Sequence, residues 1–291
     1  MTIWNLGSIN LDLVYRLDHL PQPGETLAAL RHDEGLGGKG ANQSVAAARA
    51  GSETRHVGAM GEGSPWVLDQ LIEAGVETTG IVQSADHATG HAVILVDRHA
   101  ENCIVIHPGA NRALDGERVA DALSWIDPED TLLIQNETNL QVEAAQIARA
   151  AGARVIYSAA PFDLDAVQAI LPFVSILALN RGEADRLFAA MDGDLPVDAL
   201  LITLGGDGAE YRDLVSGETL RQRAFPVAAV DTTGAGDCFA GYFAAGLDQG
   251  MAPSEALRLA AAAAALAVTR PGAGGAIPAL AEVEAFLARH G

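Results

Sequence analysis

Short apolar stretches alternate with alanine-rich segments along most of the chain, and this alternation constrains the fold more than any other feature. The stretches with the length of strands lie at residues 2–6, 93–96, 131–135, 154–157, 176–178 and 200–203. Helical spacing is clearest at residues 41–50 and 142–151, which lie between them. Strands that alternate with helices predict an α/β fold with a mostly parallel central sheet and helices on both faces. A ligand is then expected at the carboxyl ends of the strands.

Two segments depart from this alternation. Residues 13–31, which contain "PQPGE", and residues 89–107 alternate polar and apolar side chains, as strands with one solvated face do. We expect these segments to form a small sheet that stands off the main body. A length of 291 residues equally allows two domains of similar size. Because no linker or repeat divides the chain, we predict a single domain over residues 1–291.

The composition limits the classes of partner and compartment. The net charge of −20 argues against binding the phosphate backbone of nucleic acid, so a small-molecule ligand is expected. The two cysteines are too few for a disulfide framework, and Cys238 is better read as a small buried residue than as a nucleophile. The start of the chain does not resemble a signal peptide, and no apolar run has the length of a membrane span. We therefore expect a cytoplasmic protein that is not bound to a membrane.

The motif "VDTTGAGD", residues 230–237, places a carboxylate at the start of a predicted helix. We expect the preceding "AAV" to end a strand, and residues 237–247 have helical spacing. With almost no side chains on the residues just before Asp237, backbone N–H groups can approach an anion closely, and the helix dipole favours negative charge there. Asp237 could then accept a proton from a hydroxyl that attacks a phosphate. The alternative is that Asp237 only caps the helix.

A second glycine-rich motif, "GLGGKGANQ" from residue 35, also opens a helix. It is not a Walker A loop, because Lys39 is followed by Gly40 and not by serine or threonine. The motif suits close approach of the backbone to a polyhydroxy ligand, with Asn42 as a bidentate hydrogen-bond partner. A simple tight turn remains the alternative.

Polar residues follow several predicted strands. Asn10 and Asp12 in "GSINLD" and Glu137 in "LLIQNET" are expected at the ligand-binding edge of the sheet, where they could bind sugar hydroxyls or form turns. Asn180 and Glu183 in "NRGE" are spaced to share one face of a helical turn. That pair could bind Mg²⁺ or cap a helix. The glycines of "TLGGDGA", residues 203–209, could pass beneath a nucleotide or form a hairpin turn.

The ordered set of motifs resembles the PfkB carbohydrate kinase family, in its ribokinase-like branch, over nearly the whole chain. The motifs that carry the resemblance are "GSINLD", "GGKGANQ", "HPGAN", "LLIQNE", "NRGE", "TLGGDGA", "VDTTGAGD" and "AAALAVTRPGA". The resemblance implies a ribokinase-like fold and transfer of the γ-phosphoryl group of ATP to a sugar hydroxymethyl group. The small sheet would form a lid over the sugar and a homodimer interface.

The resemblance also implies a role for each motif residue. Asp237 would be the catalytic base, and the amides of Gly234, Ala235 and Gly236 would form the anion hole. The residues implied to bind the sugar are Asn10, Asp12, Gly38, Lys39, Asn42, Glu137 and Asp237. The residues implied to bind ATP are Asn180, Thr203, Gly205, Gly208 and Gly236. Asn180 and Glu183 would organise Mg²⁺. An activating K⁺ or other monovalent cation would lie among Asp231, Thr233, Ala267, Arg270, Gly272 and Ala276.

Three features depart from the ribokinase pattern. Ala261 stands where histidine is common near the adenine, Ala276 stands where serine is common, and "GEGSPW" at residues 61–66 replaces the usual acidic, glycine-containing stretch. Ribose is the expected acceptor because "GSIN" and "GGKGANQ" are ribokinase-like. Kinases of other pentoses, ketohexoses or nucleosides remain alternatives, and residues 13–31 offer only Tyr15 as an aromatic partner for a nucleobase. A non-catalytic sugar or nucleotide sensor is a further alternative. A dehydrogenase is disfavoured because the first predicted strand runs into "GSINLD" and not into the G-x-G-x-x-G motif that opens a dinucleotide site.

Overall fold

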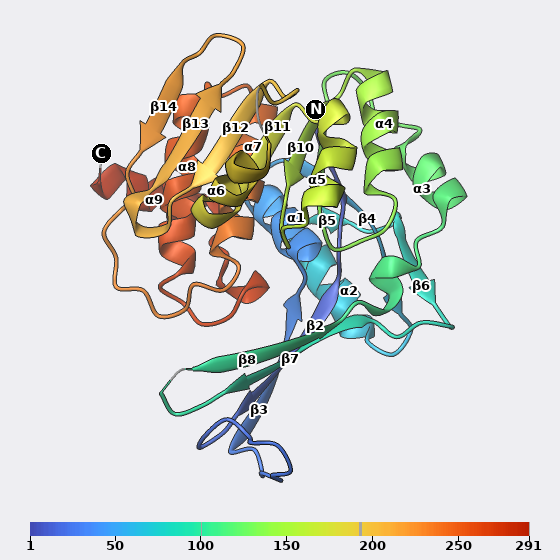
Figure 1. Cartoon of the computed structure of the whole chain (residues 1–291), viewed down its shortest axis with the longest axis vertical. Coiled ribbons are helices and arrows are strands. Elements are labelled where there is room, and N and C mark those ends of the chain that lie inside the picture. Colours follow the sequence, from blue (N-terminus) through green and yellow to red (C-terminus); the bar gives the residue numbers. More distant parts are fainter. Residues whose placement is uncertain (100, 192–193, 291) are drawn as a thin grey trace.

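The computed structural model describes residues 1–99, 101–191 and 194–290. Its centre is a mostly parallel sheet with the strand order β14-β13-β12-β11-β10-β9-β1-β4-β5, and β6 pairs with β4 (Figure 1). The parallel strands are β1 (Thr2–Leu6), β4 (Glu53–Gly61), β5 (Val76–Glu77), β6 (Ile81–Ser84), β9 (Thr131–Gln135), β10 (Arg154–Ser158), β11 (Ile176–Asn180) and β12 (Ala199–Thr203). The antiparallel strands β13 (Ala209–Asp213) and β14 (Thr219–Gln222) extend one edge.

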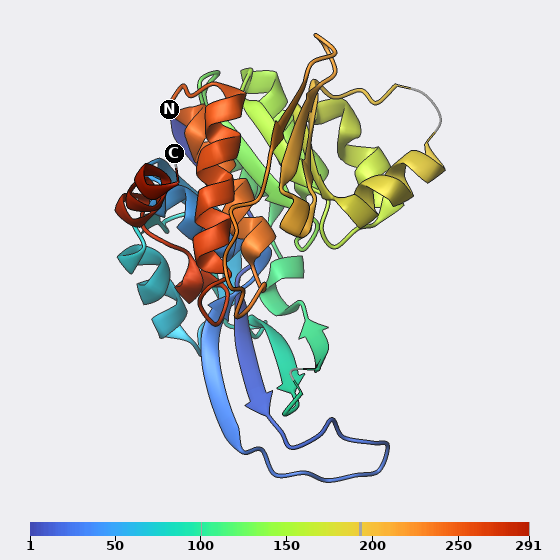
Figure 2. The same ribbon diagram turned by 90° about the vertical axis from the view of Figure 1, so that its left-hand side faces the viewer.

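Helices cover both faces of this sheet, as Figure 2 shows edge-on. One face carries α3 (Gly116–Leu123), α4 (Gln141–Ala151), α5 (Leu164–Ile170) and α6 (Arg181–Ala190). The other face carries α1 (Lys39–Arg49), α2 (Pro65–Glu73), α7 (Ala235–Asp248), α8 (Pro253–Ala267) and α9 (Leu280–Arg289). Burial on both faces explains why the central strands read as nearly continuous apolar runs. The predicted α/β fold is confirmed.

A separate four-stranded sheet projects from one end of the molecule (Figure 1). Its order is β3 (Arg31–Gly37), β2 (Asn10–Arg16), β7 (Gly90–Val96) and β8 (Asn102–His107). We call this sheet the lid sheet. The prediction of a small sheet is confirmed, and its second segment, residues 89–107, contains β7 and β8. The bounds of the first segment, residues 13–31, were wrong: β2 begins at Asn10, and β3 runs on from Arg31 through the first glycines of the second motif.

Residues 93–96 belong to β7 of the lid sheet, as the prediction of a small sheet that includes residues 89–107 implies, and not to the central sheet, because β7 pairs with β2 and β8. One sequence-based strand assignment is wrong. The "AAV" segment before Asp231 is not a strand. Its chain is tied instead to the end of α8, where the N–H groups of Val230 and Asp231 both donate to the carbonyl of Val268. Apolar character alone does not distinguish these two contexts.

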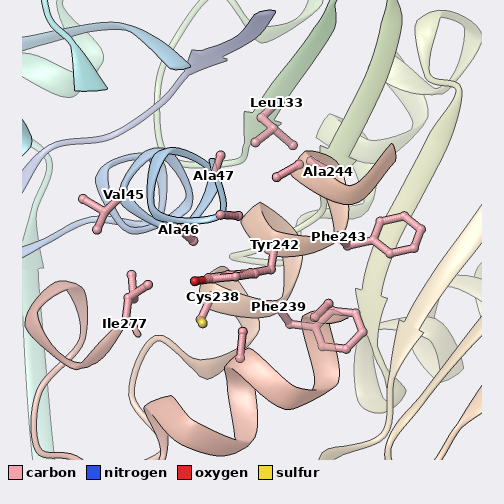
Figure 3. Packing of buried hydrophobic residues seen from close by; sticks show 14 of the residues in the cluster. Val45, Ala46, Ala47, Leu133, Cys238, Phe239, Tyr242, Phe243, Ala244 and Ile277 are labelled. Carbon is pink, nitrogen blue, oxygen red and sulfur yellow. The ribbon is translucent and has the colours of Figure 1, made fainter. Parts of the chain in front are cut away.

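Helices α1 and α7 pack closely enough to place their first turns side by side. A Cβ added at Gly241 of α7 would lie 2.5 Å from Ala46 Cβ and 2.5 Å from the carbonyl oxygen of Gln43, both in α1. Figure 3 shows Ala46 and Ala47 facing α7 at this contact. Since both helices begin at the ligand-binding edge of the sheet, the absence of a side chain at Gly241 brings the two glycine motifs together.

Gly241→Ala tests this close packing. The added methyl group should overpack the contact and lower the free energy of unfolding by about 1–3 kcal/mol, despite the better helix propensity of alanine. Gly116→Ala is the matched control, because a Cβ at that helical glycine meets no atom within 4 Å. Urea unfolding of both variants measures the effect. Equal stability of the two variants would contradict the packing argument.

Candidate active site

The start of α7 presents backbone donors. Gly234 is the N-cap residue with φ of 70°, a left-handed conformation that favours glycine. The N–H groups of Gly234 and Gly236 have no acceptor among the described residues. Ala235 differs from the predicted anion hole, because its N–H donates to the carbonyl of Thr232 at 3.2 Å. The turn therefore offers Gly234 and Gly236 to an anion, with Ala235 engaged in holding the turn.

Asp237 lies in the first turn of α7 and is buried. Its Oδ2 accepts a hydrogen bond from Asn42 Nδ2 and its Oδ1 accepts one from Gln43 Nε2, each at 3.1 Å. Among the described residues no side chain makes a capping hydrogen bond at the start of this helix, so the alternative that Asp237 only caps the helix is wrong. Burial raises the pKa of Asp237, while the charge of Lys39 and the two amide donors oppose that rise.

Lys39, Glu137 and Asp12 form a charged group beside Asp237. Lys39 Nζ lies 4.0 Å from Glu137 Oε1, and Glu137 Oε2 accepts the backbone N–H of Lys39 at 3.0 Å and the hydroxyl of Ser8. Burial raises the pKa of Asp12 to about 6, and the nearby charges of Glu137 and Asp237 add to the effect. One lysine thus faces several carboxylates, which together keep the pKa of Lys39 raised although burial lowers it.

Glycines allow these side chains to approach the backbone. Gly38 is the N-cap residue of α1 with φ of 91°, and a Cβ there would lie 2.8 Å from the carbonyl oxygen of Ser8. A Cβ at Gly37 would collide with the carboxylate of Asp12 on the neighbouring strand. The second motif is therefore more than a tight turn. Its glycines leave room for the carboxylate of Asp12 and for the backbone of Ser8 beside them.

Asn10 lies at the start of β2, not in a turn after β1, and is also buried. Its Oδ1 accepts Asn111 Nδ2 at 2.7 Å, and Asn111 Oδ1 accepts the N–H of Ile9 at 2.9 Å. Sequence reasoning did not assign Asn111, Ser8 or Gln43 to the site. All three lie inside quoted motifs, in "HPGAN", "GSINLD" and "GGKGANQ", and their position there was the available signal.

Two adjoining cavities meet at α7. A cavity of about 210 Å³ is lined by Lys39, Asn180, Glu183, Gly234 and Asp237, among others. A more apolar cavity of about 560 Å³ is lined by Gly205, Gly208, Phe225, Ala261 and Val268, among others. Both cavities include Thr203, Gly236 and Phe239 in their linings. Ala261 lies on the wall of the apolar cavity.

Asn180 and Glu183 form a reciprocal helix cap. Asn180 Oδ1 accepts the N–H of Glu183 at 2.9 Å, and Glu183 Oε2 accepts the N–H of Asn180 at 2.8 Å. Both residues also line the smaller cavity, so capping and metal binding are compatible roles. Among the residues described, no group of three or more His, Cys, Asp or Glu side chains could hold a metal by itself. A divalent ion here would depend on phosphate and water oxygens as well.

The glycines after β12 form the turn between β12 and the antiparallel β13, so the hairpin interpretation is correct. A Cβ at Gly208 would collide with the carbonyl oxygen of Gln222, which explains the glycine there. The same residues line the apolar cavity. The turn can therefore contact a nucleotide without being built only for that purpose.

Asp231 joins the two segments predicted to hold a monovalent cation. Its Oδ1 accepts the N–H of Thr233 and its Oδ2 accepts the N–H of Gly272, both at 2.9 Å. The Arg270 side chain points elsewhere and pairs with Glu282. Ala267 and Ala276 are buried. Any contribution of Ala267, Arg270, Gly272 and Ala276 to a cation site would come from backbone carbonyls.

Comparison with known proteins agrees with this geometry. Residues 3–280 match the family described as pfkB family carbohydrate kinase. The chain therefore belongs to the PfkB family of carbohydrate kinases.

Within that family the chain is similar to ribokinases. It is 36% identical to the ribokinase of Haemophilus influenzae, with 98% of each chain covered. The ribokinase structure from Thermotoga maritima is 35% identical, with a TM-score of 0.88 over 99% of each chain. The Arabidopsis thaliana ribokinase complexed with ribose and ATP is 29% identical, with a TM-score of 0.86 over 98% of each chain.

The raised pKa of Asp12 predicts a pH-dependent stability cost. A carboxyl with a pKa of 3.8 when unfolded and about 6 when folded destabilises the fold above pH 6, and the cost vanishes below pH 4. Asp12→Asn should therefore raise the free energy of unfolding by about 2 kcal/mol at pH 7.5 and by much less at pH 4.

Urea unfolding at the two pH values measures this difference. Asp69→Asn, at an exposed position of α2, is the control and should change the stability by less than about 0.5 kcal/mol. An Asp12→Asn variant that is no more stable than the parent at pH 7.5 would contradict this prediction. It would show that the ionised Asp12 carboxylate does not destabilise the fold at that pH.

Proposed function

We propose that this chain is an ATP-dependent ribokinase, which transfers the γ-phosphoryl group of ATP to the hydroxymethyl group of ribose to give ribose 5-phosphate. The observation that carries the proposal is the position of Asp237. This buried carboxylate lies near Asp12, Lys39 and Glu137, in the first turn of α7. The N–H groups of Gly234 and Gly236, at the start of the same helix, have no acceptor in the part of the chain that the structure describes. Similarity to ribokinases over nearly the full chain supports ribose as the acceptor.

The reaction follows from these positions. Asp237 accepts the proton of the sugar hydroxyl as its oxygen bonds to the γ-phosphorus, and the bond from that phosphorus to the bridging oxygen of ADP breaks. The N–H groups of Gly234 and Gly236 stabilise charge on the transferred group. The sugar would be held by Asn10, Asp12, Gly38, Lys39, Asn42 and Glu137. ATP would lie along Asn180, Thr203, Gly205, Gly208 and Gly236.

We propose Mg²⁺ as the divalent ion that accompanies ATP. Glu183 and Asn180 would help to hold it from the wall of the smaller cavity, together with phosphate oxygens and water. When bound, the ion neutralises negative charge on the phosphates.

We also propose a monovalent cation site, with K⁺ as its preferred ion, between the turn of Asp231 and Thr233 and the loop of Gly272. Backbone carbonyl oxygens suit a large, weakly hydrated cation. Because Asp231 already ties the two segments together, an ion there would stiffen the turn that presents Gly234 and Gly236.

Three further properties of the protein remain predictions. The first is that residues 1–291 form a single domain. The second is a homodimer through the lid sheet, supported by exposed apolar residues on its edge strand β8, where Ile104, Val105 and Ile106 are 49%, 61% and 55% exposed. The third is a cytoplasmic location. None of the helices in the described ranges is long and apolar enough to cross a bilayer.

An acceptor screen with ATP and Mg²⁺ tests the proposed function. ADP release should be fastest with ribose and slower with other pentoses, ketohexoses and nucleosides. Asp237→Asn should reduce kcat with ribose by about 10²–10⁴-fold, the range typical of a general base. The variant should stay folded, because asparagine fills the same volume. Near-normal turnover of Asp237→Asn, or a preferred acceptor other than ribose, would overturn the corresponding part of the proposal.

The cation proposal predicts that activity rises with K⁺ and rises less with Na⁺. The measurement uses a Tris buffer free of alkali metals, with KCl, NaCl or choline chloride added at equal ionic strength. The effect should lie mainly in kcat, because the ion acts on the turn before α7. Equal rates in the three salts would rule out an activating site at Asp231.

A further inference from the structure

A chain of buried side-chain amides leads from Asp237 away from the cavities into the molecule. Gln43 Nε2 donates to Asp237 Oδ1 at 3.1 Å, and Gln43 Oε1 accepts Gln135 Nε2 at 2.8 Å. Gln135 Nε2 also donates to Asn5 Oδ1 at 2.9 Å, and Asn5 Nδ2 donates to the carbonyl of Gly40 at 2.9 Å. The chain thus joins Asp237 to a backbone carbonyl through α1, β9 and β1.

These three amides are shut off from solvent. Asn5 and Gln43 are 0% exposed and Gln135 is 1% exposed. Buried amides are costly unless they are paired, and Gln135 Oε1 has no partner among the described residues. Apolar residues of similar size would avoid this cost. The retained amides therefore need an explanation beyond packing.

The hydrogen bonds fix the orientation of each amide group in this hydrogen-bonded series. The carbonyl of Gly40 can only accept, so the nitrogen of Asn5 must face it and the oxygen of Asn5 must face Gln135. Gln135 then presents its nitrogen to Asn5 and to Gln43. Gln43 is left with its nitrogen toward Asp237. A reversed Gln43 would direct its oxygen at a carboxylate oxygen, which is repulsive.

We propose that Asn5, Gln135 and Gln43 are positioning residues that act as one unit, keeping an N–H group directed at Oδ1 of Asp237 so that this carboxylate stays ionised and correctly oriented to accept the sugar proton. The proposal rests on the proposed role of Asp237 as the base. The three residues are not expected to contact substrate, because they lie behind Asp237 and line neither cavity at α7.

Other titratable groups near Asp237 also influence its protonation. The groups that face it or lie near it are Lys39 on α1, Asp12 on β2, Glu137 after β9, Glu183 on α6 and the buried thiol of Cys238. Burial raises the pKa of that thiol, so it is uncharged near neutral pH and behaves as the small buried residue that the sequence indicated. The amide unit adds a neutral donor that no change in pH removes.

Three substitutions test the unit: Asn5→Leu, Gln135→Met and Gln43→Met. Gln43→Met removes the donor itself, whereas Asn5→Leu and Gln135→Met remove the hydrogen bonds that orient it. Each new side chain is apolar and similar in shape to the one that it replaces. Hydrogen bonds to the ionised form favour that form, so their loss should move the acid limb of the kcat profile upward by about one pH unit. The profile of kcat reports groups in the substrate complex, and the KM for ribose should stay within about twofold.

The double variant Asn5→Leu/Gln135→Met tests whether the residues act as one unit or contribute independently to the acid limb. Members of one network are not additive, so its acid limb should move no further than that of either single variant. The double variant also leaves fewer unpaired amides than Gln135→Met alone, which keeps the test open if a single variant folds poorly. Gln249→Met is the matched control. It removes an amide at an exposed position at the far end of α7, bonded to Ala50 and Ser52, and should leave the limb unchanged.

The results distinguish failure of the positioning unit from failure of the assignment of Asp237 as the base. Unchanged acid limbs in the folded variants, or additive shifts in the double variant, would overturn the positioning unit. If Asp237→Asn is inactive under the same conditions, the base assignment survives that failure. If Asp237→Asn turns over normally, the base assignment fails whatever the limbs do, and the positioning role fails with it.

Discussion

The close contact of α1 with α7 at Gly241 is the constraint on which the site depends. It brings the first turns of the two helices together, so that Asn42 and Gln43 of one helix reach Asp237 of the other. A side chain at Gly241 would push the helices apart and separate the carboxylate from both donors. The chemistry proposed here needs that carboxylate buried, ionised and aimed. A packing detail in the apolar core therefore sets the geometry of the polar site.

The charge balance of the site follows from the same burial. Asp12, Glu137 and Asp237 lie near one lysine, Lys39, in a protein of net charge −20. Such a site suits a neutral polyhydroxy ligand, whose hydroxyls donate to carboxylates. The triphosphate would instead be received by backbone N–H groups, such as those of Gly234 and Gly236, and by metal ions. The raised pKa of Asp12 is the stability cost of this arrangement.

Much of this arrangement could be predicted from the sequence. The alternation of strands and helices gave the fold class, and the glycine motifs identified Asp237 and Lys39. The "AAV" segment was misassigned because an apolar run looks alike in a strand and in an extended loop. For the same reason residues 93–96 were grouped with the central strands, although they also lay within the predicted small sheet. β4 was missed because it mixes charged and apolar residues in "ETRHVGAMG". The amide pair Asn5 and Gln135 could not be found, since only the packed structure shows two strands and a helix meeting behind Asp237.

We infer that Asp237 is the group that faces the attacking hydroxyl. A crystal structure with ribose and a non-hydrolysable ATP analogue would show directly whether it does. We predict that the hydroxymethyl oxygen of ribose lies within hydrogen-bond distance of an Asp237 carboxylate oxygen, about 2.6–3.2 Å. The γ-phosphate should accept the N–H groups of Gly234 and Gly236. A complex in which another residue contacts that oxygen, with Asp237 bonded only to Asn42 and Gln43, would contradict the account.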